Sequence, residues 1–218
     1  MLRKVRISLA AIFFICITLL FLDFTGTIHA WLGWMAKIQF LPAVLALNVG
    51  IIVLLVVLTL LFGRIYCSAI CPLGVMQDII SWFGGKRKKN RFSYSAEKRW
   101  LRYGVLIVFV VLFVAGLNSI ALLIAPYSAY GRIAQNLLAP IWGFGNNILA
   151  FFAERIDSYA FYSTEVWIRS WVTFGVAVAT LGIVGYLAWR SGRTYCNTIC
   201  PVGTVLGFLS RFSLLRPV

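Results

Sequence analysis

Residues 63–74 read GRIYCSAICPLG and residues 192–203 read GRTYCNTICPVG, so that both stretches fit the pattern GRxYCxxxCPxG. Each copy follows an apolar run and carries two cysteines at the same spacing. A purely structural repeat has no need for two thiols in each copy. The recurrence therefore indicates that these cysteines bear the function. They are Cys67 and Cys71 in the first copy and Cys196 and Cys200 in the second.

The rest of the chain is strongly apolar. Of its 218 residues, 61% are hydrophobic and 12% are charged, whereas about a quarter of the residues in a soluble domain are charged. A helix needs about 20 apolar residues to cross a bilayer. Four runs come close to this length, and they predict an all-α, polytopic membrane protein with four main transmembrane helices. The runs are about 5–24, 41–63, 101–125 and 168–189.

The net charge of +14 is distributed as membrane insertion requires. With the N-terminus inside, 16 of the 20 Lys and Arg residues fall on the inner side, which agrees with the positive-inside rule. We therefore expect both termini on the cytoplasmic side, and we do not expect a nucleic-acid partner. The basic run 86–91 is expected to contact lipid headgroups. A docking surface for an acidic electron-transfer partner is the alternative.

The motifs divide the chain into two repeats, residues 1–100 and 101–218. Each repeat contains two helices, the cysteine motif and an amphipathic stretch that we expect to form an interfacial helix. Because both repeats begin and end inside, they should be parallel and related by a pseudo-two-fold axis along the membrane normal. This arrangement brings all four cysteines to one face. The apolar positions of the two amphipathic stretches are Leu73, Met76, Ile79, Ile80 and Phe83, then Val202, Val205, Leu206, Leu209 and Phe212.

Residues 126–165 are the ambiguous part of this topology. They include an apolar run broken by Pro140, Gly143 and Gly145. We expect an outer re-entrant or interfacial helical hairpin. A fifth crossing would instead move the second motif to the outer face and separate the two cysteine pairs. The N-terminal run is longer than the apolar core of a signal peptide, and we expect it to be a retained helix.

Four thiolates match the ligand set of one iron–sulfur cluster, [4Fe–4S] or [2Fe–2S], or of one zinc or copper(I) ion. In a helical CxxxC segment both sulfurs can face the same way. Pro72 and Pro201 then suit the first turn of a following helix, whose positive end favours an anionic group. Arg64 and Arg193 could add to that field. A disulfide within a pair is not expected in the reducing cytosol.

Other residues offer little chemistry. His29 is the single histidine, so a bis-histidine haem site within this chain is excluded. Asp23 lies at the outer end of the first span, where proximity to headgroups is the simpler explanation and a proton path is the alternative. Cys16, alone in the first helix, is expected to pack as an apolar side chain.

These motifs resemble the membrane portion of the NosR/NapH-type polyferredoxins, which are electron-transfer proteins of the bacterial inner membrane. Besides the cysteine motifs, FLDF at 21–24 and APYSAYGR at 125–132 carry the resemblance. It implies a multi-pass inner-membrane location and redox roles for the four cysteines. It also implies a ferredoxin-like domain or subunit as partner and a possible flavoprotein on the outer side. Arg132 could there meet a flavin phosphate or a quinone, although lipid phosphate is the simpler partner.

Family members commonly continue into a ferredoxin-like domain where this sequence stops at Val218. A shortened sequence and a natural division into subunits both account for this difference. We therefore expect an electron-transfer component of a redox complex rather than a stand-alone enzyme. The alternatives are a quinone-linked thiol–disulfide oxidoreductase, a copper- or zinc-handling membrane protein, and a membrane anchor without a cofactor.

Overall fold

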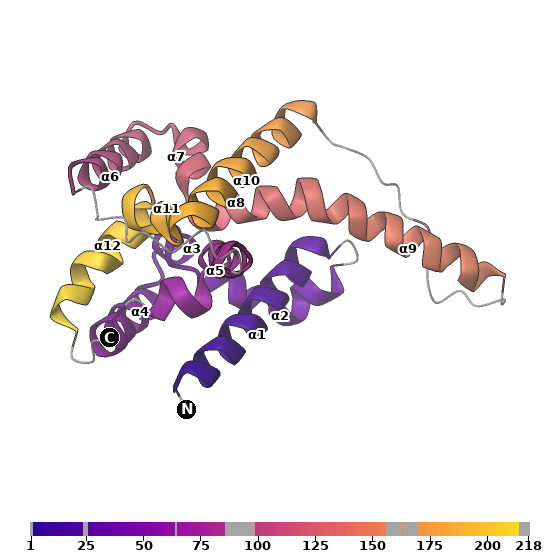
Figure 1. Cartoon of the computed structure of the whole chain (residues 1–218), viewed down its shortest axis with the longest axis horizontal. Coiled ribbons are helices and arrows are strands. Elements are labelled where there is room, and N and C mark those ends of the chain that lie inside the picture. The colour runs from indigo at the N-terminus through magenta and orange to yellow at the C-terminus, as the bar shows by residue number, and fades with distance from the viewer. Residues whose placement is uncertain are drawn as a thin grey trace.

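The computed structural model describes residues 2–23, 26–63, 65–85, 99–155, 163 and 170–213. Within these ranges all regular secondary structure is helical and no strand occurs, which confirms the predicted all-α class (Figure 1). Arg64 and the basic run 86–91 lie outside the described residues.

The first half of the chain contains five α-helices and one π-helical turn among the described residues. They are α1 (Leu2–Leu22), α2 (Thr27–Lys37), α3 (Phe40–Leu45), α4 (Val49–Phe62), the π turn η1 (Tyr66–Ile70) and α5 (Pro72–Gly85).

The second half begins with α6 and ends with a 3-10 turn. Its elements are α6 (Arg99–Val114), α7 (Asn118–Ile124), α8 (Pro126–Ile133), the π turn η2 (Ala134–Leu138), α9 (Ala139–Glu154), α10 (Trp171–Ser191), α11 (Thr194–Thr198), α12 (Pro201–Leu209) and the turn η3 (Ser210–Phe212).

Two of the four predicted spans form helices that are long and apolar enough to cross a membrane. These are Lys4–Leu22 within α1 and the whole of α10. The other two are apolar but shorter: α4 has 14 residues and α6 has 16. At about 1.5 Å per residue they reach roughly 21 and 24 Å, against about 30 Å of hydrocarbon. The four-span arrangement therefore remains a proposal.

Each of the two shorter predicted spans is interrupted by a local turn signal. The run 41–63 breaks between α3 and α4, where Leu47 has a φ of 49° and the side chain of Asn48 accepts a hydrogen bond from the Ile51 N–H. Asparagine is a favourable residue at the start of a helix. The run 101–125 breaks at Gly116, whose φ of 77° ends α6 in a left-handed cap.

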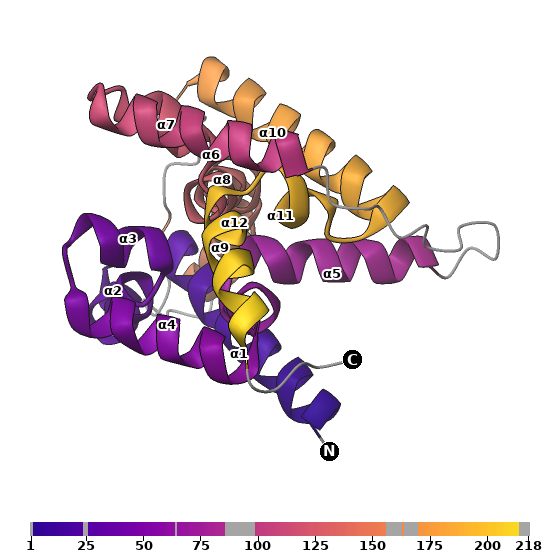
Figure 2. The same cartoon turned by 90° about the vertical axis from the view of Figure 1, so that its left-hand side faces the viewer.

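The two halves pack by exchanging helices (Figure 2). The helix after the first motif, α5, packs on α10, which precedes the second motif. In the same way, α12 packs on α4, which precedes the first motif. The helix α1 contacts η1 and α5, and α6 makes the matching contacts with α11 and α12. Equivalent elements of the two halves thus make equivalent contacts, and both motifs contribute to one buried core. The pseudo-two-fold axis stays a prediction.

The two helices after the motifs occur where the amphipathic stretches were predicted, but their first turns are buried in the core and not laid on a surface. Leu73 and Leu206 are fully buried. In contrast, Ile79, Phe83 and Phe212 belong to the predicted apolar faces and are exposed. Helix exchange therefore buries the first turns between the halves, and the interfacial position of the two helices stays a prediction.

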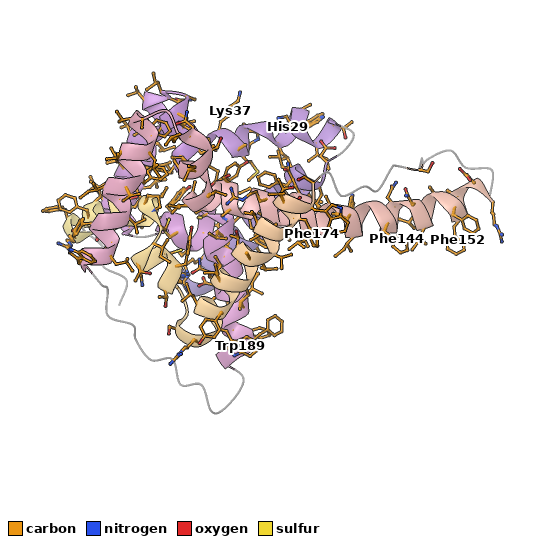
Figure 3. All side chains as sticks on the ribbon, turned by 90° about the horizontal axis from the view of Figure 1, so that it is seen from above. His29, Lys37, Phe144, Phe152, Phe174 and Trp189 are labelled. Atoms are coloured by element: carbon orange, nitrogen blue, oxygen red, sulfur yellow. The ribbon has the colours of Figure 1, made fainter. Side chains whose placement is uncertain are left out.

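Residues 126–154 form one continuous helical rod, made of α8, η2 and α9. Its first part packs on α1, α5 and α10, whereas α9 extends away from the rest of the molecule (Figure 1). Phe144 and Phe152 lie along this extended part (Figure 3). The segment is helical as predicted, but the expected fold back of a hairpin does not occur within 126–154.

Candidate functional site

The two cysteine motifs begin with glycines of similar backbone conformation. Gly63 ends α4 with φ 69° and ψ −139°, and Gly192 ends α10 with φ 68° and ψ −124°. Such positive φ values favour glycine because it lacks a Cβ. The glycine that opens each GRxYCxxxCPxG motif thus turns the chain sharply from the preceding helix into the cysteine turn.

Each motif then forms a turn that is one residue wider than an α-helical turn. The Cys71 N–H donates to the Tyr66 carbonyl at 2.9 Å, and the Cys200 N–H donates to the Tyr195 carbonyl at 3.0 Å. Both second cysteines have extended backbone, with ψ of 116° and 118°. The residue before a proline is restricted to this region. The expected helix through both cysteines of a pair therefore ends before the second one.

A new helix starts directly after each second cysteine. Pro72 is the first residue of α5, and Pro201 is the first residue of α12. The Gly203 N–H donates to the Cys200 sulfur at 3.3 Å, so that this sulfur accepts from the first turn of α12. The positive end of a helix stabilises a thiolate in this position. The predicted placement of the sulfurs beside helix N-termini is therefore present at Cys200.

The four motif cysteines lie in a single buried core. Their exposed fractions are between 3% and 7%, and all four belong to one contiguous cluster of buried residues that draws on both halves. Cys16 is only partly buried on α1 and is not a member of this cluster. All five cysteines are in the described ranges, and none forms a disulfide.

The thiols of the two motifs are close enough to influence each other's protonation. Burial, together with the neighbouring Cys67, raises the pKa of Cys71 to about 12. Burial also raises the pKa of Cys196 and Cys200 well above the usual range, and the first-motif thiols add to this effect. Four thiolates at this site therefore need a positively charged centre to compensate them.

The four buried thiols match the number and type of ligands that an iron–sulfur cluster takes. A single tetrahedral ion needs sulfurs about 3.8 Å apart, since each Zn–S bond is about 2.3 Å long. Among the described side chains, no group of three or more His, Cys, Asp or Glu could hold one metal ion. A [4Fe–4S] cluster places iron and sulfide between its four thiolates, and it therefore takes ligands that stand further apart.

Charged and polar side chains from one half reach the motif of the other. Arg193, the arginine of the second motif, forms a two-pronged ion pair with Asp78 of α5, with its Nε 2.6 Å from Oδ1. Burial lowers the pKa of Arg193, but the bond to Asp78 more than offsets this, and the pKa lies above its ordinary value. The charges of Cys196 and Cys67 act in the same direction, so the predicted cation does lie near the thiols.

The motif tyrosines bond the cysteine turns to earlier parts of the chain, at the start of α3 and at the end of α7. The hydroxyl of Tyr66 donates to the Gln39 side-chain oxygen and accepts from the Phe40 N–H, both at 2.9 Å. The hydroxyl of Tyr195 donates to the Ile124 carbonyl at 2.6 Å. These bonds fix the start of each turn against a neighbouring helix end.

Arg132 is engaged within the fold. Its guanidinium donates to the carbonyls of Leu122 and Leu123 and to the hydroxyl of Ser128. A cation in this place caps the C-terminus of α7, where the helix dipole is negative. These bonds give Arg132 a structural role, and its contact with lipid phosphate, a flavin phosphate or a quinone stays a prediction.

Asp23 likewise has a local structural role. Its carboxylate accepts from the backbone N–H groups of Gly26, at 3.0 Å, and His29, at 2.8 Å. Both donors lie at the beginning of α2, where a negative charge is favourable. Capping of α2 accounts for this acid without a proton path.

Sequence reasoning missed three residues that touch the motifs: Gln77, Asp78 and Arg102. Gln77 donates to the Cys196 sulfur, and Arg102 donates to the carbonyls of Gly203 and Thr204. Gln77 lies one helical turn after Leu73 on a face that is otherwise apolar, and this polar exception was the available signal. The Asp78 and Arg102 contacts join distant parts of the chain and have no local signal.

Comparison with known proteins identifies two matches to one family model. Residues 44–90 and 171–218 each match the 4Fe-4S binding domain family, and each segment contains one cysteine motif. An iron–sulfur cluster is the cofactor that these matches support. No solved structure matches the chain.

Several curated proteins are similar over most of this chain. The ferredoxin-type protein NapH of Escherichia coli is 28% identical over 78% of the chain and 46% of its own length. The methylamine utilization ferredoxin-type protein MauN of Paracoccus denitrificans is 24% identical over 86% of the chain and 50% of its own length. The NapH protein of Haemophilus influenzae is 24% identical over 81% of the chain. The chain spans about half the length of the curated relatives that it matches.

Proposed function

We propose that this chain, which belongs to the NapH-type polyferredoxin family, is a membrane electron-transfer subunit whose two cysteine motifs share one [4Fe–4S] cluster. Family membership supports a ferredoxin-type protein that transfers electrons. The position of the cluster, its ligands and its sharing between repeats go beyond that membership. They rest on the geometry of this chain.

The observation that carries the shared cluster is the helix exchange. Because α5 crosses to α10 and α12 crosses to α4, the turn that precedes each of these helices is drawn to the centre. Cys67, Cys71, Cys196 and Cys200 therefore lie in one core. Iron in this core would receive four thiolates, and a cluster so bound accepts and releases one electron at a time.

The charges around the core support the same assignment. A [4Fe–4S] cluster with four thiolates is an anion, and Arg193 is held beside it by Asp78. The start of α12 adds the positive end of a helix dipole at Cys200. Arg64 occupies the same motif position as Arg193 and is proposed to act in the same way.

Membrane insertion with both termini in the cytoplasm is part of the proposal. It is supported by the distribution of Lys and Arg and by the two helices that are long enough to span. It places the cluster near the cytoplasmic face. Electrons would then pass between a donor at the cytoplasmic or quinone level and an extracytoplasmic redox partner. A ferredoxin-like domain or subunit and an outer flavoprotein are the proposed partners.

The experiment is to purify the protein anaerobically in detergent and to measure iron, acid-labile sulfide and the EPR spectrum after reduction. We expect about four iron atoms and four sulfides for each chain. Cys67→Ser and Cys196→Ser, made separately, should each remove the whole cluster, because each motif supplies half of its ligands. Cys16→Ser is the matched control and should keep the full iron content.

Other results would point to other functions. If each single variant kept half of the iron, two separate sites would replace the shared one. Iron-free protein with stoichiometric zinc or copper would favour metal handling. Iron-free protein whose motif thiols cycle through a disulfide with quinone would favour a thiol–disulfide oxidoreductase, although such exchange requires thiol access and these thiols are buried.

A further inference from the structure

One side chain outside the ligand set touches a ligand sulfur. Gln77 lies on α5 in the first repeat and is completely buried. Its Nε2 lies 3.4 Å from the sulfur of Cys196, a residue of the second repeat. An amide N–H at this distance is a donor to sulfur, and a thiolate is the stronger acceptor for it.

A buried glutamine at this position is costly for stability. Its Oε1 has no hydrogen-bond partner among the described residues. Leaving a buried polar atom unpaired destabilises the folded state, because the atom loses its hydrogen bonds to water. An apolar side chain would avoid this cost, so packing alone does not explain the glutamine. The hydrogen bond from its amide to Cys196 is the contact that a leucine could not make.

The second repeat shows what the position requires for packing alone. Gln77 comes five residues after Pro72, and Leu206 comes five residues after Pro201. Leu206 is also fully buried. The two repeats therefore place a hydrogen-bond donor on one side of the site and an aliphatic side chain on the other.

We infer that Gln77 sets the reduction potential of the cluster by donating a hydrogen bond to the Cys196 thiolate. The inference rests on the proposed function, because it requires a cluster at these cysteines. Reduction adds one electron and thus increases the negative charge on the cluster and its sulfurs. A donor to sulfur stabilises the reduced form more than the oxidised form, and so it raises the potential.

The test is a redox titration of the purified holoprotein, followed by EPR, with Gln77→Met. Methionine has a similar length and volume but no N–H group. At a fixed ambient potential near the midpoint, we expect the ratio of reduced to oxidised cluster to fall roughly three- to tenfold. A tenfold change corresponds to about 59 mV for a one-electron couple. Gln77→Leu, which copies the second repeat, should shift the ratio in the same direction.

The control is Thr59→Val. Thr59 is also buried, and its hydroxyl donates to the Leu55 carbonyl on its own helix α4 instead of bonding to sulfur or to a cysteine motif. Thr59→Val removes a buried hydrogen-bond donor at nearly constant volume, and it should leave the potential nearly unchanged. Equal shifts in Gln77→Met and Thr59→Val would show a general effect of buried polar groups and would overturn the inference.

The outcomes separate this inference from the proposed function. A wild-type protein without iron contradicts the proposed function itself. A wild-type cluster whose potential is unchanged in Gln77→Met overturns the role of Gln77 alone. If both Gln77 variants lose the cluster, the wild type labelled with ¹⁵N in glutamine side chains decides the question. A hyperfine coupling from an amide nitrogen to the reduced cluster is then expected, and its absence contradicts the inference.

Discussion

The last glycine of each motif, Gly74 or Gly203, allows the cysteine turn to pack against the helix that follows it. A Cβ built at Gly74 would overlap the carbonyl oxygen of Cys67, and one built at Gly203 would overlap the carbonyl oxygen of Cys196. In both cases the obstacle is backbone and cannot move aside as a flexible side chain could. The final glycine of GRxYCxxxCPxG is therefore a packing requirement that the cysteine spacing imposes.

Gly203→Ala should disrupt the second motif. We expect a loss of about 1–3 kcal/mol or more of stability, because an overpacked site must displace backbone, together with loss of iron. Thermal unfolding in detergent and iron analysis measure the two effects. Gly104→Ala on α6 is the control, since its Cβ would meet nothing within 4 Å. Equal iron content and equal melting temperature in both variants would show that the close approach at Gly203 has no consequence.

At the scale of elements, the exchanged packing of α5 on α10 joins the two halves. The contact begins at the ion pair of Asp78 with Arg193 and continues to Gly84, where a Cβ would stand 3.0 Å from the Trp189 carbonyl oxygen. Figure 3 shows Trp189 near the end of α10. Small residues at such crossings let helices approach closely. The ion pair and the close approach at Gly84 together therefore fix the register of one half against the other.

A double-mutant cycle measures this ion pair. Asp78→Asn, Arg193→Gln and the double variant should give a coupling free energy of about 1 kcal/mol. A two-pronged arginine–carboxylate pair is stronger than a simple surface pair, but the Asp78 side chain is 40% exposed and solvent screens it. Arg190→Gln replaces Arg193→Gln in the control cycle, because Arg190 bonds to Tyr186 on its own helix. Equal coupling in both cycles would contradict a specific link between the halves.

At the scale of the whole molecule, many large apolar side chains are exposed on the helices. The described part of α6 exposes Ile107, Val108 and Val111 together, and α10 exposes Val172 and Ile183. Contiguous exposed apolar surface of this kind marks contact with a membrane or another protein. The exposed apolar faces of α6 and α10 are therefore surfaces that lipid would cover if these helices lie in a membrane.

Ile107→Arg tests whether the shorter helix α6 spans the membrane. Ile107 is 63% exposed near the middle of this helix, where an arginine costs about 2.5–3.5 kcal/mol on insertion. We expect less protein to remain in membranes after an alkaline carbonate wash. Phe208→Arg on α12 is the control, since Phe208 is exposed outside the predicted spans and should tolerate the charge. Full retention of both variants would contradict a spanning α6.

Several features of this fold were predictable because they depend on local signals. The all-α class follows from long apolar runs, and the helix starts at Pro72 and Pro201 follow from the restrictions that proline imposes. The breaks at Asn48 and Gly116 had equally local signals, but the apolar runs around them suggested continuous spans. Hydrophobicity over a long window outweighed single turn residues in that prediction. Each of these two runs therefore forms two helices where one continuous helix was predicted.

The sequence by itself determined the repeated motif, the four candidate ligands and the reason to expect that the two copies meet. Only the tertiary structure decided that α5 and α12 exchange partners and bury their first turns. It also decided that Gln77 and Asp78 of the first half reach Cys196 and Arg193 of the second. Spacing and conformational preference act between near neighbours, whereas these contacts join residues more than a hundred positions apart. Such contacts arise only when the packing of the whole chain brings them together.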